Sequence, residues 1–346
     1  MGGGFCSRAA YTDAAERHWY CRHLLVLCIF LRSSIYYCIQ DGTRNQRANL
    51  GTNTTTLEPH ALTPPLVLVA DIGGTHITTA LVELPSGRLL EDTLHRGHVR
   101  AQAGVNIILD DWAAVMQRSM QGADVQALGI AMPGPFDYET GISLIKGFHK
   151  YEALYGKNVK TLLMQRLDLQ SIRMANDARC FLQGELLAGA VQGAQELMGF
   201  TLGTGFGSSV AAQGIAQEAH YYDFPFRGTR AEDYFCSRWL VQRYAVLEPN
   251  ALIADVKTIA MRAADDGAAR QLFSEFGGNL AEFFSLLEVP PALALLGGNI
   301  TNSYFLFGPA LEAALQQYGI PTQIKLASLG EAAPLYGAAA LFLQGA

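Results

Sequence analysis

Two glycine-rich turns in the sequence carry residue types that are suited to holding phosphate groups. The first spans residues 71–75 and reads Asp-Ile-Gly-Gly-Thr, and the second spans residues 203–207 and reads Gly-Thr-Gly-Phe-Gly. Glycine leaves the backbone N–H groups of a turn open to phosphate oxygens, because no side chain obstructs their approach. One such turn is more often an ordinary hairpin, but the pair, together with Gly297 and Gly298, favours a nucleotide site.

Neither turn matches the common phosphate-binding motifs. Both lack the lysine of a Walker loop, and the second lacks the glycine spacing of a dinucleotide-binding fingerprint. Asp71 directly follows the apolar run 66–70, and a carboxylate in that position is costly to bury unless it meets a cation. The Mg²⁺ that accompanies ATP is such a cation, so we predict that Asp71 contacts this metal through water.

Asn176 and Asp177 stand where a predicted strand, 171–175, passes into a predicted helix, 178–190. Either residue can cap that helix, because both side chains accept hydrogen bonds from the first N–H groups. A carboxylate in this place is equally suited to general base catalysis, in which it accepts the proton of an attacking hydroxyl group. The residues alone leave both interpretations open.

Four further polar residues lie in the second half of the chain. Thr229 and Glu232 have the spacing of a capping box that opens a helix through Trp239. The sequence supports this role for Glu232 about as well as it supports contact between Glu232 and a ligand. Asp223 lies within the aromatic stretch 221–226, and His220 directly precedes it. These two residues either bind sugar hydroxyl groups or satisfy each other within a loop.

Length and composition narrow the class of protein. A chain of 346 residues exceeds one ordinary core, so two domains around a cleft are expected. The net charge of −6 and the scattered basic residues argue against a nucleic-acid partner. The longest apolar run, Leu24 to Leu31, is too short to span a membrane. The six cysteines form no metal or disulfide pattern, which favours the cytoplasm.

The periodicity divides the chain into four segments. A strand-turn-strand pattern occurs twice, about 130 residues apart, which suggests two duplicated lobes. We expect an N-terminal α/β lobe at 65–188, a C-terminal α/β lobe at 189–330, and a C-terminal helix at 331–346 that returns to the first lobe. Residues 1–64 lack sustained periodicity, and no methionine separates Met1 from Met116. We interpret 1–64 as a poorly ordered extension upstream of a mis-assigned start.

Taken in order, five motifs resemble those of the ROK family of sugar kinases and sugar-responsive repressors. The motifs are the two glycine turns, Met132-Pro133-Gly134-Pro135-Phe136-Asp137, Asn176-Asp177-Ala178 and Gly297-Gly298. The resemblance extends over about residues 66–343. It implies a two-lobed α/β fold of the actin-like, RNase H-like ATPase type, with the active site in the cleft between the lobes.

The resemblance also implies roles for particular residues. The resemblance implies that two sets of residues face the ATP phosphates and Mg²⁺. One lobe contributes Asp71, Gly73, Gly74 and Thr75, and the other contributes Gly203, Thr204 and Gly205. Gly297 and Gly298 would lie against adenosine. Asn176 and Asp177 would bind the sugar, with Asp177 as the base, and Glu232 matches a sugar-contacting glutamate.

The sequence departs from the family in the loop before Glu232. The family often has a cysteine-rich zinc loop there, whereas this chain has Arg-Gly-Thr-Arg at 227–230, so we expect no zinc. The family's Glu-x-Gly-His-x-Pro motif is also altered. Anchoring on Pro225 puts His220 at the glutamate position and Asp223 at the histidine position, whereas matching His220 to the histidine puts Gln217 at the glutamate position.

These observations predict an ATP-dependent sugar kinase that uses ATP and Mg²⁺ and acts on a hexose or hexose derivative, with Asp177 as general base. Two alternatives remain, a sugar-responsive transcriptional regulator of the same family and a non-catalytic sugar-binding protein. The sugar, the hydroxyl group that is phosphorylated and the oligomeric state, for which a homodimer is one option, are left open.

Overall fold

The computed structural model describes residues 66–84, 86–147, 149–251 and 255–343, all of which belong to one compact unit. The interpretation of residues 1–64 as an extension upstream of a mis-assigned start lies outside these residues. None of the helices in the described ranges is long and apolar enough to cross a membrane.

A five-stranded sheet organises the first half of the described chain. Its order is β3-β2-β1-β4-β7, in which β1 pairs antiparallel with β2 and parallel with β4, and β4 pairs parallel with β7. The strands are β1 (Leu66–Ile72), β2 (His76–Glu83), β3 (Arg88–His98), β4 (Ala127–Ala131) and β7 (Ser171–Ala175).

A second five-stranded sheet repeats this arrangement. Its order is β10-β9-β8-β13-β14, in which β8 pairs antiparallel with β9 and parallel with β13, and β13 pairs parallel with β14. The strands are β8 (Leu197–Leu202), β9 (Phe206–Ala212), β10 (Ile215–Ala219), β13 (Leu293–Gly297) and β14 (Gln323–Leu326). The duplication that the sequence suggested is therefore present in the strand order and direction of both sheets.

The two faces of the first sheet bury different helices. Alternate residues of β1 point to opposite faces, as expected for an extended strand. Leu68 joins the core that contains α2 (Val105–Met120) and α3 (Val159–Leu167), whereas Val67 joins the core that contains α9 (Ala333–Ala340). Both faces of β1 are apolar because both are covered.

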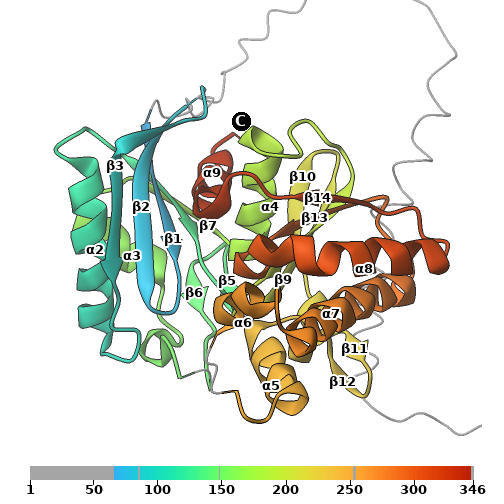
Figure 1. Ribbon diagram of the computed structural model, residues 1–346. Helices are drawn as coiled ribbons and strands as arrows, with labels where there is room; N and C mark the ends of the chain where they lie inside the picture. Colours follow the sequence, from blue (N-terminus) through green and yellow to red (C-terminus); the bar gives the residue numbers. More distant parts are fainter. Residues whose placement is uncertain (1–65, 85, 148, 252–254, 344–346) are drawn as a thin grey trace, which may run out of the picture. The chain divides into compact units, whose positions relative to one another are not determined.

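Helices α4 (Asp177–Ala188) and α9 lie side by side between the two sheets (Figure 1). The helix α4 packs on β8, β9 and β10, while α9 packs on β1 and β4. Two glycines permit the close approach, because a Cβ on Gly184 would lie 2.0 Å from the Ala333 carbonyl oxygen and one on Gly337 would lie 1.8 Å from that of Cys180. The two helices therefore touch backbone to backbone.

Helices and aromatic side chains cover the second sheet. The helices of this half are α5 (Ser237–Leu247), α6 (Val256–Arg262), α7 (Gly267–Leu286) and α8 (Tyr304–Gln317). Phe283 of α7 is fully buried and lies within 6.4 Å, ring centre to ring centre, of seven other aromatic rings. Three of these rings, Tyr221, Phe224 and Phe226, come from the loop after β10, so aromatic packing holds that loop. Two small hairpins, β5 (Phe136–Asp137) with β6 (Ile142–Ser143) and β11 (Pro225–Phe226) with β12 (Thr229–Arg230), complete the strands of the described residues.

The structure corrects two helices expected from the sequence. The helix expected to run from Thr229 through Trp239 is broken into a short 3₁₀ turn, Ala231–Asp233, and α5, which begins at Ser237. In the segment 331–346, expected to be a helix from its first residue, a 3₁₀ turn at Gly330–Ala332 precedes α9. Strand β3 was not anticipated.

Candidate active site

Asp71 and Asp177 meet at one edge of the first sheet. The parallel neighbours β1, β4 and β7 have their carboxyl ends at this edge, where ligands of open α/β sheets usually bind. Asp71 of β1 is in register with Ala131 of β4, which pairs in turn with Ala175 of β7. Asp177 comes two residues later, so β1 and β7 deliver both carboxylates to the same region.

The first glycine turn is held by backbone and side-chain hydrogen bonds. The Gly73 N–H donates to the His76 carbonyl oxygen at 2.9 Å, and the Tyr151 hydroxyl donates to the Gly73 carbonyl oxygen at 2.5 Å. The Val99 N–H donates to the Thr75 carbonyl oxygen at 2.9 Å. Gly74 carries no side chain between these anchors, and Thr75 is exposed. The turn is fixed in place while its tip stays open to a ligand.

The structure separates the roles of Asn176 and Asp177. Asn176 is the N-cap of α4, because its Oδ1 accepts hydrogen bonds from the N–H groups of Ala178 at 2.8 Å and Arg179 at 3.3 Å. Asp177 is the first residue of the helix, and its Oδ1 accepts from the same Ala178 N–H at 2.9 Å. Because Asn176 supplies the cap, the carboxylate of Asp177 is not needed for that role.

The pKa values of both aspartates are raised. Burial raises the pKa of Asp177, and the Ala178 N–H opposes this effect. Burial raises the pKa of Asp71 to about 7, with further increases from the charges of Asp177 and Glu331 and a decrease from Arg96. Arg96 of β3 and Glu331 are themselves joined by an ion pair of 2.6 Å. A carboxyl group held like Asp71 is suited to a cation, because a nearby positive charge would restore its ionised form.

The second glycine turn is anchored by the start of α5. The Ser237 N–H and hydroxyl donate to the Gly203 carbonyl oxygen at 2.7 and 2.9 Å. Gly203, Thr204 and Gly205 are at least partly exposed, and Glu232 Oε2 lies 3.3 Å from the point that a Cβ on Gly205 would occupy. The carboxylate of Glu232 thus stands beside the tip of the turn.

This position of Glu232 overturns the predicted capping box. The box of the 3₁₀ turn pairs Arg230 with Asp233, and the Arg230 N–H donates to Asp233 Oδ2 at 3.4 Å. Thr229 cannot be the cap because it belongs to β12, where it pairs with Phe226. Glu232 is therefore not occupied as a helix cap.

Gly297 and Gly298 have different surroundings. Gly297 is buried against the ring of Phe181, whereas Gly298 is exposed and has a φ of 88°. Beyond Gly298 lies a cavity of about 930 Å³, lined by residues of α5, α6 and the segment 299–305. Ser237 lines this cavity and also binds the second glycine turn, so the cavity opens next to that turn.

His220 and Asp223 each lie near a charged residue. His220 Nδ1 lies 3.7 Å from Glu218 Oε1, and Asp223, whose side chain is 58% exposed, lies 3.9 Å from Arg230. Sequence reasoning missed Glu218, which comes two residues before His220. The charge of Glu218 contributes to raising the pKa of Tyr138, although burial contributes more.

Tyr138 links the turn after β4 to Asn176. The Tyr138 hydroxyl donates to the Met132 carbonyl oxygen at 2.9 Å, and Asn176 Nδ2 lies 3.5 Å from the same hydroxyl. The charge of Glu218, at the end of β10, also acts on Tyr138. No spacing in the sequence signals this grouping, since the residues belong to three separate elements.

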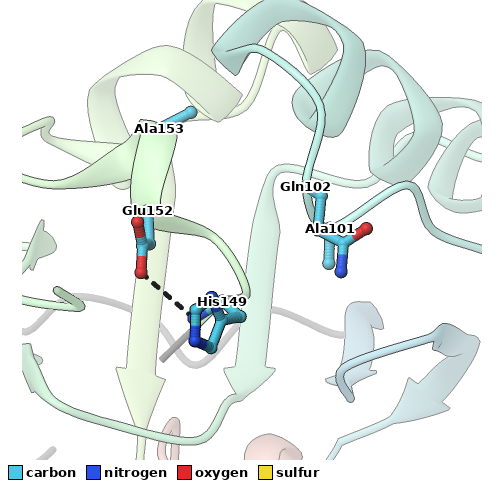
Figure 2. Close-up of a pocket in the computed structure, with 5 residues that line it drawn as sticks. All are labelled: Ala101, Gln102, His149, Glu152 and Ala153. Carbon is cyan, nitrogen blue, oxygen red and sulfur yellow. Dashed lines mark hydrogen bonds between the residues drawn. The ribbon is translucent and has the colours of Figure 1, made fainter. Parts of the chain in front are cut away.

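A smaller cavity of about 250 Å³ lies beside the segment that precedes Tyr151. Figure 2 shows its lining residues, Ala101, Gln102, His149, Glu152 and Ala153. The His149 N–H donates to Glu152 Oε1 at 3.1 Å. Within the described ranges, no three His, Cys, Asp or Glu side chains gather closely enough to hold a metal ion. The expected absence of zinc stays a prediction.

Comparison with known proteins finds a family that matches part of the chain. Residues 67–220 match the ROK family. The N-acetyl-D-glucosamine kinase of Histophilus somni (strain 129Pt) is 27% identical over 313 residues, which cover 79% of this chain and 98% of that protein.

Solved structures share the fold. The ROK family glucokinase from Streptomyces griseus, in complex with glucose and AMPPNP, has a TM-score of 0.65 and 25% identity, over 81% of this chain and all of that one. A ROK family transcriptional regulator has a TM-score of 0.68 at 18% identity, over 80% of this chain and 78% of the regulator, which shows the fold alone.

These findings confirm the two-lobed fold and the resemblance that five motifs predicted. The alignment with the N-acetyl-D-glucosamine kinase extends over nearly the whole length of that protein, and the similar solved structures include sugar kinases. Residues 67–220 of the chain are therefore similar to the ROK family, and most of the chain is similar to sugar kinases.

Proposed function

We propose that the chain is an ATP-dependent sugar kinase with Asp177 as its general base. The observation that carries the proposal is the convergence of Asp177 and the Asp71 turn at one edge of the first sheet. Phosphoryl transfer needs a proton acceptor beside the attacking hydroxyl and a cradle for the phosphates, and this edge offers both.

In the proposed reaction, Asp177 accepts the proton of a sugar hydroxyl group while the hydroxyl oxygen attacks the γ-phosphorus of ATP. The bond between the γ-phosphorus and the oxygen that bridges to the β-phosphate breaks, so the products are the sugar phosphate and ADP. Mg²⁺ on the nucleotide would neutralise phosphate charge, and Asp71 is the residue proposed to contact it through water. The raised pKa of Asp177 makes it a stronger base than an exposed aspartate.

The nucleotide is proposed to lie across both glycine turns. Gly73, Gly74 and Thr75 would face the phosphates from the first lobe, and Gly203, Thr204 and Gly205 from the second. The 930 Å³ cavity next to Gly298 is large enough for adenosine and adjoins the second turn through Ser237. Gly297, which is buried, would lie behind Gly298 at the edge of this cavity.

The sugar is proposed to contact Asn176, Asp177, His220 and Glu232. Asp223 is a weaker candidate, because its ion pair with Arg230 would have to open. We propose an acceptor among hexoses and N-acetylhexosamines, with N-acetyl-D-glucosamine the first to be tested. The kinase of that name from Histophilus somni matches this chain over 98% of its own length.

The test is a coupled assay of ADP release across hexoses, N-acetylhexosamines and related sugars, with sugar-free reactions as the background. We expect at least one sugar to raise the rate far above the rate of ATP hydrolysis alone. Sugar binding without any sugar-dependent ADP release would instead favour the regulator or the non-catalytic binding protein.

A further inference from the structure

We infer that Lys150 binds the terminal phosphate of the nucleotide, as a cation delivered to the first glycine turn from a distant part of the chain. The inference rests on the proposed function and names a residue that the family motifs do not contain. It is carried by the position of Lys150, by the conformation of its neighbours and by the composition of the two turns.

The two turns supply backbone N–H groups but no cationic side chain. Neither 71–76 nor 203–207 contains lysine or arginine. Transfer of a phosphoryl group is assisted by positive charge placed in advance beside the equatorial oxygens. A cation for this purpose must therefore reach the turns from another segment.

Lys150 reaches the first turn. Its Nζ lies 2.5 Å from the point that a Cβ on Gly74 would occupy, and its Cδ and Cε lie 2.8 Å from that point. The side chain thus lies across Gly74, in space that any other residue at position 74 would occupy. In the described part of the chain, the Lys150 ammonium has no ion pair or hydrogen bond, so it is available to an anion.

The backbone on both sides of Lys150 is strained. His149 has a φ of 56° and Tyr151 a φ of 57°, and both residues lack the freedom of glycine in this left-handed region. Such strain persists only where the surroundings enforce it. Strained residues are often found at ligand-binding segments, and here they flank one exposed lysine.

Tyr151 enforces this conformation. Its ring is 1% exposed and lies 5.3 Å from the ring of Trp112, centre to centre. Its hydroxyl donates to the Gly73 carbonyl oxygen and its N–H donates to the Ala101 carbonyl oxygen at 2.7 Å. Since Tyr151 is tied to the first glycine turn, Lys150 is held next to the same turn.

The terminal phosphate is the expected partner. The turn that contains Gly74 also contains Asp71, whose pKa responds to the charge of Asp177. The transferred phosphoryl group must come within reach of a sugar hydroxyl beside Asp177, and hence near this turn. The second turn adjoins the large cavity and would hold the phosphates nearer adenosine.

The test compares the dissociation constants of Mg·AMPPNP and Mg·ADP by titration calorimetry. We expect Lys150→Met to weaken AMPPNP binding roughly 10- to 100-fold, the scale of a lost charge-assisted hydrogen bond, and ADP binding less than about 3-fold. Lys150→Arg should keep AMPPNP affinity within about 3-fold of the unaltered protein. The matched control is Lys157→Met, which removes another exposed lysine of the same segment and should change neither constant.

Gly74→Ala provides a second route, because the added Cβ would displace the Lys150 side chain and should lower AMPPNP affinity in the same direction. AMPPNP affinity within 2-fold of the unaltered protein in Lys150→Met, or equal losses for AMPPNP and ADP, would overturn the inference and leave the kinase proposal standing. If the unaltered protein bound no AMPPNP and phosphorylated no sugar, both proposals would fail.

Discussion

The two sheets share one topology but differ in the residues that come after their last strand. After β7 the chain places Asn176 and Asp177, and after β14 it places Ala327 and Ser328. In the second sheet the N–H groups of Ser328 and Leu329 donate to Glu185 Oε1 at 2.9 and 2.8 Å. The segment after the last strand of the sheet thus provides a carboxylate, Asp177, in the first lobe. In the second lobe the equivalent segment is hydrogen-bonded to Glu185 of α4.

The ends of the first strands differ in the same way. Asp71 of β1 is in register with Ala131 of β4, and its counterpart in the second sheet is Thr201, which is in register with Gly297. The first lobe therefore has a charged group where the second has a hydroxyl group. A duplicated scaffold needs only one set of reacting groups, so the second copy is free to serve the nucleotide.

The largest effect is expected from Asp177→Asn. Loss of a general base usually lowers kcat by about two to four orders of magnitude, whereas the fold should persist because Asn176 provides the cap. The measurement is steady-state kinetics with an active sugar, alongside a melting curve. The matched control is Ser328→Ala at the equivalent place, which should stay within a few-fold of the unaltered protein. If both variants lost activity equally, the assignment of chemistry to one lobe would be wrong.

The second prediction compares how much unfolding free energy is lost in Gly298→Ala and in Gly74→Ala. Gly298 has a φ of 88°, and a Cβ there would lie 2.4 Å from the Leu202 carbonyl oxygen, which is backbone and cannot yield cheaply. We expect roughly 2–4 kcal/mol of lost unfolding free energy. In Gly74→Ala the added Cβ contacts only the flexible end of the Lys150 side chain, so the loss of unfolding free energy should be less than about 1 kcal/mol. Urea denaturation measures both, and equal losses would contradict this contrast.

Asp71→Asn is expected to stabilise the ligand-free protein. Because the folded-state pKa of Asp71 is raised from 3.8 to about 7, its contribution to stability is fully present below pH 3.8 and is lost as the pH rises through 7. The variant avoids this loss, so its melting temperature should exceed that of the unaltered protein by roughly 2–5 °C at pH 8.

The gain should shrink as the pH falls from 8 towards 5, because Asp71 then becomes protonated and neutral in the folded protein. Thr201→Ser at the counterpart position changes no titratable group, so its effect on melting temperature should not vary with pH. A gain for Asp71→Asn that is the same at pH 5 and pH 8 would show that charge is not its cause.

The smallest effect is expected from removing metals that bind tightly. The loop after β10 is held by rings packed around Phe283, so no structural zinc is needed there. Treatment with a chelator followed by excess Mg²⁺ should leave activity unchanged, and elemental analysis should find well under one zinc per chain. One zinc per chain, lost together with activity, would contradict this prediction.

Strong periodicity made much of the first lobe predictable. The helical spacing of residues 105–120 and 159–167 and the apolar run 171–175 each predict an element, and the structure has α2, α3 and β7 with these bounds. Strand β3 was missed because it is a largely exposed edge strand, rich in charged residues, whose register with β2 is interrupted between Thr79 and Leu81.

The site was predictable only where residues share one turn. The glycine turns and the Asn176-Asp177 pair can be recognised from the sequence, because their chemistry depends on residues that are adjacent in the chain. Lys150 is 76 residues from Gly74, and Glu218 belongs to a different lobe from Tyr138, so only the packing of the chain brings each pair together. The capping box failed for a related reason, since pairing with Phe226 fixed Thr229 in a strand.

The crossing of α4 and α9 has a consequence for how the protein folds. The first sheet cannot bury the face formed by Val67, Val69 and Ala80 until residues 333–340, more than 250 positions later, have been synthesised. Contacts between such distant positions slow folding and leave apolar surface exposed to aggregation in the meantime. We therefore expect the face of the first sheet that α9 covers to stay exposed until the C-terminal segment is available to pack on it.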